Sequence, residues 1–345
     1  MDFSILAFLA QDGLTTGAIY ALVALALVLV FSVTRTILVC QGDFVTYSAL
    51  TLATLQLGLM PGTVWLLLGC SLAACALDCT DAARRRQWRL LPVLLARYLS
   101  LPLLLWAVLG NLDLASLPAL LQILLTLALV TPLGPLLYRL VYQRVAETSV
   151  LLLLIVSVAV HIALVGVSLL MFGAEGVRTE ALAESVFMLG ELPVGLQSLL
   201  VIGSALLLIG LLYAFFGHSL YGKALRATAL NRTGAQLVGI PTQLAGKAAF
   251  GLAALIGAIS GVLIGPLTTL YYDSGFLISL KGFVAAIFGG LASYPIAAAS
   301  AFFVGVLESF ANFGASAYKE VIVFTVVIPV LLWLSLKNPH LEEQH

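Results

Sequence analysis

Apolar runs long enough to cross a membrane follow one another along almost the whole chain. A helix needs about 20 apolar residues to span the hydrocarbon core of a bilayer. Of the 345 residues 62% are hydrophobic, whereas soluble domains are roughly 45–50% apolar. The runs occupy 14–33, 42–59, 61–77, 90–110, 117–138, 149–172, 194–216, 244–270, 276–292, 296–313 and 321–336. The sequence therefore predicts an all-α fold, a polytopic transmembrane helical bundle with about 9–11 spans that forms one domain over 1–345.

The run at 276–292 is the weakest, because Lys281 interrupts it and glycine is frequent. It either crosses the membrane or re-enters on one side. If every run crosses and the Arg97 side chain extends to the basic side, 13 of the 16 Lys and Arg residues fall on one side. Arg178 and Lys319 then lie opposite, and Lys281 lies inside a run. Basic residues concentrate in cytoplasmic loops. The charges predict an outer N-terminus, a cytoplasmic C-terminus and an outward-facing loop at 173–193 with four acidic residues, Glu175, Glu180, Glu184 and Glu191.

One basic connection, Gly217–Pro241, stands out between two long apolar runs and is called the central polar segment below. It contains Lys223, Arg226 and Arg232 and no acidic residue, which predicts a cytoplasmic location. The stretch 223–230 is rich in Ala and Leu and predicts a short helix. Its expected stop signals are Gly234, Gly239 and Pro241. A helix in this position offers another protein a surface to push.

Several polar side chains lie within the apolar runs, where such groups usually face a bundle interior or a water-filled path. Lys281 and Glu308 either form a structural ion pair or meet the charged ends of a passing zwitterion. Asp43 either caps the second helix or belongs to an inner gate, and capping is the preferred interpretation. His161 is expected to be a hydrogen-bonded packing residue. The candidate substrate pathway comprises Thr15, Tyr20, Gln41, Asp43, Tyr47, Lys281, Glu308 and Asn312.

Gly257, Gly261 and Gly265 recur at every fourth position of one run and line one helix face with backbone. Close packing against another helix of the same chain is the preferred interpretation. A dimer seam or a sliding surface is the alternative.

The sequence contains no pattern typical of an enzyme. The four cysteines lack the spacing of a zinc or redox site, and no Ser/His/Asp set is evident. Residues 217–223 have the spacing of a phosphate-binding loop, but Ala224 stands where Ser or Thr must reach the metal ion. We therefore expect no metal site, no catalysis, no bound nucleic acid and no ATP hydrolysis by this chain alone.

Four short motifs occur in a familiar order: GLTTGAIYALVAL from Gly13, QGDF from Gln41, GKALRA from Gly222 with Gly239-Ile240, and KGF from Lys281 with GGLAS at 289–293. Together they resemble the permeases of branched-chain amino acid ABC importers, and the resemblance extends from about residue 13 to residue 336. The stretch 76–116 looks longer than in that family and adds one hairpin. A peripheral, lipid-facing position is the simplest expectation for it.

The resemblance implies a multi-pass bacterial inner-membrane subunit that pairs with a second, related permease. Two cytoplasmic ATPases, which bind the ATP and magnesium, would drive the pair, and a periplasmic binding protein would deliver the solute. The substrate class would be branched-chain or hydrophobic amino acids, or related small polar solutes. The resemblance also implies that the central polar segment is the helix that docks on an ATPase, through Gly222, Lys223, Ala224, Leu225, Arg226, Ala227, Ala229, Gly239 and Ile240.

A different class of function also fits the residues. An autonomous secondary transporter or channel would use Lys281 and Glu308 for ion coupling and would work without an ATPase. Transport by the purified chain alone would distinguish the two.

Overall fold

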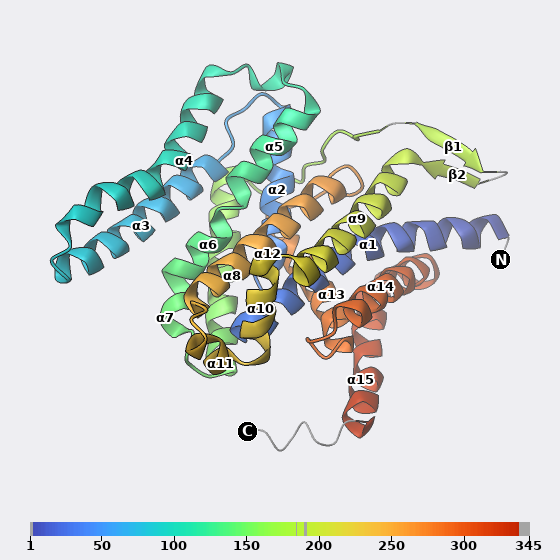
Figure 1. Ribbon diagram of the computed structural model, residues 1–345. Helices are drawn as coiled ribbons and strands as arrows, with labels where there is room; N and C mark the ends of the chain where they lie inside the picture. The colour runs from blue at the N-terminus through green and yellow to red at the C-terminus, as the bar shows by residue number, and fades with distance from the viewer. Residues whose placement is uncertain (1–2, 184, 190–191, 338–345) are drawn as a thin grey trace. The chain divides into compact units, whose positions relative to one another are not determined.

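The computed structural model describes residues 3–183, 185–189 and 192–337, and helices account for nearly all of its regular structure (Figure 1). Glu184, Glu191 and the tail after Lys337 lie outside the described residues. The helices are α1 (Phe3–Thr34), α2 (Gln41–Gln56), α3 (Thr63–Arg84), α4 (Leu91–Asn111), α5 (Ala119–Val130), α6 (Leu133–Leu137), α7 (Gln143–Val145), α8 (Val150–Phe172), α9 (Leu196–His218), α10 (Leu220–Leu230), α11 (Arg232–Leu237), α12 (Thr242–Ile264), α13 (Gly275–Phe288), α14 (Tyr294–Ala315) and α15 (Lys319–Lys337).

Short segments of other structure join these helices. Turns of 3-10 helix lie at Trp88–Leu90, Leu114–Ser116 and Ser316–Tyr318, and a π-helical turn lies at Tyr138–Tyr142. Two short antiparallel strands lie in the loop predicted to face outward and just after it, β1 (Val186–Leu189) and β2 (Leu192–Gly195). The sequence did not predict these strands.

Eight helical stretches in the described part of the chain are long and apolar enough to cross a membrane. They are Ile5–Thr34, Thr63–Arg84, Trp88–Asn111, Ala119–Val145, Val150–Phe172, Leu196–His218, Thr242–Ile264 and Tyr294–Val326. The polytopic helical bundle is thus confirmed. The count is below the expected range because α2 has 16 residues and α13 only 14, and because α14 and the start of α15 form one stretch. At 1.5 Å per residue, α2 and α13 fall short of the roughly 30 Å core.

The chain divides into two compact units. Unit 1 contains the described residues of Met1–Val28, Ala183–Tyr213 and Ile278–His345, and unit 2 contains Leu29–Leu182 and Ala214–Leu277. Three helices, α1, α9 and α13, contribute residues to both units.

The core of unit 2 is α2, which is buried along almost its whole length and packs mainly against α12. Gly257 and Gly261 make the close approach possible. A Cβ at Gly257 would lie 2.8 Å from the Phe44 Cβ, and one at Gly261 would lie 2.7 Å from the Ser48 Cβ. Gly265 instead faces Thr179. This glycine face of α12 is therefore occupied by other segments of the same chain.

In unit 1, α1 and α14 approach each other in the same way. A Cβ at Gly17 would lie 2.8 Å from the Phe302 Cα, and Gly305 of α14 faces the backbone of Gly17. The spacing Gly13-x-x-x-Gly17 is the small-residue signature of such close helix contacts. It brings the polar residues of α1 next to those of α14.

Candidate transport sites

The central polar segment folds as two short helices, α10 and α11, joined at Asn231. The Ser219 hydroxyl caps α10 by accepting a hydrogen bond of 2.9 Å from the Gly222 amide. The Asn231 side chain caps α11 by accepting one of 2.8 Å from the Gly234 amide. The predicted helix at 223–230 is confirmed. Gly234 as a stop signal is wrong, because the Asn231 cap starts a new helix through it, and Gly239, at φ +85°, follows the end of α11.

The two faces of α10 differ in chemistry. Gly222, Leu225 and Thr228 are buried, and Gly222 lies directly against the backbone of Phe215 at the end of α9. Lys223 and Arg226 are exposed on the other side, and neither forms an ion pair within the part of the chain that the structure describes. Ala227 and Ala229 are half-buried between these faces. The cations of α10 are thus free to meet a partner.

An apolar cavity of about 400 Å³ lies beside α10, between this helix, the segment 239–241 that follows α11 and the start of α12. It brings together two parts of the predicted motif, since Ala224 and Leu225 line it with Gly239 and Ile240. Tyr221 at its edge is 74% exposed. In addition, the Arg232 guanidinium donates to the Ala146 carbonyl at 3.2 Å, which holds α11 against the end of α7. The segment therefore offers an apolar recess next to exposed cations.

A cluster of ionisable groups surrounds Lys281 in unit 1. Lys281 is 5% exposed, and its ammonium donates to Glu308 at 2.5 Å and to Glu320 at 3.1 Å. The Tyr20 hydroxyl donates to the second oxygen of Glu308 at 2.7 Å. The other Glu320 oxygen, Oε2, is buried without a hydrogen-bond partner. One ammonium thus faces two carboxylates, which leaves an excess of negative charge.

Two predicted pathway residues lie apart from these contacts. The Thr15 hydroxyl is buried and donates to the Gln11 carbonyl, one turn earlier in α1. Asn312 is exposed and accepts a hydrogen bond from Ser316. Sequence reasoning missed Glu320, because it opens the last helix beside Lys319 and looks like part of a solvated end.

The QGDF motif at the start of α2 forms a third polar group, in unit 2. His161 Nδ1 of α8 lies 2.9 Å from both carboxylate oxygens of Asp43, and the His161 ring stacks on Phe276. Gln41 donates to the Ala253 carbonyl at 3.0 Å, and Tyr47 donates to the Leu164 carbonyl at 2.7 Å. The prediction that Asp43 caps α2 is wrong, since Cys40 is the N-cap residue and no side chain caps this helix. The carboxylate is used instead to hold α8 against α2.

Among the described residues, no group of three or more His, Cys, Asp or Glu side chains is arranged to hold a metal ion.

Comparison with known proteins identifies the relatives of this chain. The profile of a family described as branched-chain amino acid transport system, permease component, matches residues 9–331. No solved structure matches.

Three curated relatives are high-affinity branched-chain amino acid transport system permease proteins. LivH of Salmonella typhimurium is 34% identical over 120 residues, and LivH of Escherichia coli K12 is 33% identical over 120 residues; each match covers 34% of this chain and 39% of the relative. BraD of Pseudomonas aeruginosa is 33% identical over 140 residues, which are 40% of this chain and 45% of the relative. The chain thus spans less than half the length of the curated relatives in these matches.

Proposed function

This chain belongs to the branched-chain amino acid transport system permease family, and from that premise we propose that it is the membrane-spanning subunit of an ATP-driven importer. The proposed solutes are branched-chain or other hydrophobic amino acids, or related small polar molecules. The proposed location is the inner membrane of a bacterium. The proposed partners are a second, related permease, two cytoplasmic ATPases that bind ATP and magnesium, and a periplasmic solute-binding protein.

The observation that carries this proposal is the surface of α10. Lys223 and Arg226 are exposed and unpaired among the described residues, and the cavity lined by Ala224 and Ile240 lies next to them. Exposed cations steer a partner and fix its orientation, whereas an apolar recess supplies affinity by removing a side chain from water. A protein that docks here would press on a helix that lies against the end of α9 and shares a cavity with the first turns of α12.

The proposed mechanism is alternating access. Gly222 lies against the last turn of α9, and the cavity wall includes the first turns of α12. A push on α10 would therefore be transmitted to both helices as a tilt, because packed helices move as rigid elements. Repeated closure and opening of the ATPases would expose a central solute path first outward and then inward.

The test is charge reversal at Arg226 in cells that carry the complete transport system. We expect Arg226→Glu to abolish uptake of labelled leucine, because a partner surface that complements the cations of α10 would repel the new carboxylate, while the binding protein still binds leucine. Arg85→Glu is the matched control, since Arg85 is also exposed but lies in the turn after α3. Normal uptake by Arg226→Glu would count heavily against docking at α10.

The Lys281 cluster is the observation that favours the second candidate, a secondary transporter or channel. A buried group of one ammonium and two carboxylates can exchange a proton or a cation during transport. Purified chain in liposomes separates the two candidates. Solute accumulation driven by an ion gradient without ATPase would support the second candidate and overturn the first.

A further inference from the structure

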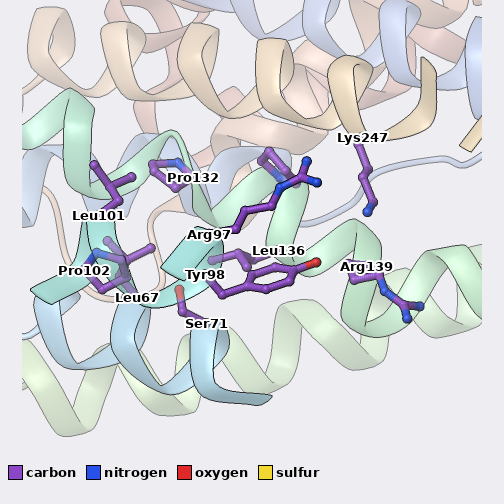
Figure 2. Close-up of a pocket in the computed structure, with 11 residues that line it drawn as sticks. Leu67, Ser71, Arg97, Tyr98, Leu101, Pro102, Pro132, Leu136, Arg139 and Lys247 are labelled. Atoms are coloured by element: carbon purple, nitrogen blue, oxygen red, sulfur yellow. The ribbon is translucent and has the colours of Figure 1, made fainter. Parts of the chain in front are cut away.

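A second pocket lies in unit 2, where the α3–α4 hairpin meets α6 and α12. Its volume is about 190 Å³, and its two ends differ in chemistry. Figure 2 shows the polar ends of Arg97, Tyr98, Arg139 and Lys247 gathered at one end, with the apolar side chains of Leu101, Pro102 and Leu67 at the other. None of these residues belongs to the sites described above. The hairpin includes most of the stretch predicted to be longer than usual, 76–116.

The cations at the polar end are not all paired. The Arg139 guanidinium forms ion pairs with Asp78 and with Asp81, and the Tyr98 hydroxyl donates to Asp78 at 2.6 Å. These bonds fix Arg139 in place and occupy both carboxylates. Arg97 and Lys247 form no ion pair with any described residue, so two of the three cations that line the pocket are not bonded to a carboxylate. Both are available to bind an anion.

The surroundings of the pocket indicate where this anion comes from. Side chains of the hairpin on either side are apolar and exposed, with Trp65 at 56%, Val93 at 61% and Leu104 at 58%. Such a surface is typical of contact with lipid. Arg97 lies six residues after the start of α4, about 9 Å along the helix from the turn that carries four arginines. On the predicted topology this turn faces the cytoplasm, where the leaflet is rich in anionic lipid.

We propose that this pocket binds the headgroup of an anionic phospholipid from the inner leaflet. Arg97 and Lys247 would donate to the phosphate oxygens, with Arg139 as a fixed third charge. Basic pockets between membrane helices on the cytoplasmic side suit such headgroups. The apolar end at Leu101 and Pro102 accepts the first carbons of an acyl chain, which a free phosphate ion would leave empty. The bound lipid would join the added hairpin to α6 and α12.

The test measures lipid retention by the full-length chain with native mass spectrometry, after purification in neutral detergent and titration with phosphatidylglycerol or phosphatidylcholine. We expect one tightly held phosphatidylglycerol and no such phosphatidylcholine. The double variant Arg97→Gln/Lys247→Gln should weaken phosphatidylglycerol binding roughly 30-fold, on the basis of the typical contribution of two basic residues near a membrane surface. Arg97→Gln alone, at an exposed position, should give part of this loss without affecting folding.

The matched control is Arg85→Gln/Arg89→Gln, which removes the same charge from the exposed turn of the hairpin. Retention of the lipid by this control together with loss in the pocket variant supports the proposal. Equal loss in both variants would show a diffuse attraction and overturn it. Displacement of phosphatidylglycerol by inorganic phosphate at the same concentration would also overturn the proposal, since a free ion would then be the ligand. These outcomes do not depend on uptake, so they stand apart from the proposed transport function.

Discussion

The Lys281 side chain connects three helices at a buried position, where a charged group costs free energy unless it is paired. It extends from α13 to Glu308 of α14 and Glu320 of α15, and Tyr20 of α1 completes the group. Removing one partner of a buried ion pair leaves an uncompensated charge, which costs more than the pair contributes. The two open interpretations, a structural pair and a solute site, can therefore be separated by removing the charges one at a time and then together.

We expect Lys281→Met to lower the stability of the protein by about 3–5 kcal/mol, because Glu308 and Glu320 lose their shared cation. The melting temperature in detergent is the measurement. Glu320→Gln should cost less, since the Glu320 side chain is 35% exposed and the Glu308 pair remains.

The double variant Lys281→Met/Glu308→Gln tests the structural interpretation. We expect it to recover much of the melting temperature and the uptake lost in Lys281→Met, because the more buried of the two unpaired carboxylates is gone and Tyr20 can still donate to the amide oxygen. Recovery of stability with no recovery of uptake would contradict a purely structural role and place the pair in the solute path.

At the scale of helices, the sequence was informative wherever one local property decides the outcome. Apolar length predicted α8 and α9 to within two residues, although the run predicted at 244–270 extends six residues beyond the end of α12. Basic charge with Ala and Leu predicted α10. Prediction from the sequence failed where the role of a residue depends on a partner that is distant in the sequence. Asp43 is not a cap because His161 is 118 residues away in sequence and 2.9 Å away in space. The role of Glu320 could not be predicted for the same reason, since its partner Lys281 is 39 residues away in sequence.

The α2–α12 contact gives a prediction about packing. We expect Gly261→Ala to destabilise the protein by about 1–3 kcal/mol, the usual cost of overpacking a core. A Cβ there would meet the Val45 carbonyl and lie 2.7 Å from the Ser48 Cβ. Gly166→Ala in α8 is the control, because nothing lies within 4 Å of its added Cβ. Thermal unfolding in detergent compares them, and equal melting temperatures would argue against a close α2–α12 approach.

For the molecule as a whole, orientation in the membrane decides whether the proposed sites can work. The central polar segment must be reachable from the cytoplasm for an ATPase, and the turn after α3 must lie on the same side for the proposed lipid. Both belong to unit 2, as does the first part of the acidic loop. Their relative sides therefore follow from the helices between them, and the excess of basic residues predicts which side is inner.

We expect accessibility of single cysteines to show this arrangement. In a background with Cys40, Cys70, Cys75 and Cys79 replaced by alanine, Glu175→Cys should react with a membrane-impermeant maleimide added to intact spheroplasts. Lys223→Cys and Arg85→Cys should react only after the membrane is opened. All three positions are exposed, so differences in labelling report the side of the membrane and not burial. Labelling of Lys223→Cys from outside would place α10 in the wrong compartment for an ATPase, and both the docking surface and the cytoplasmic lipid pocket would then have to be abandoned.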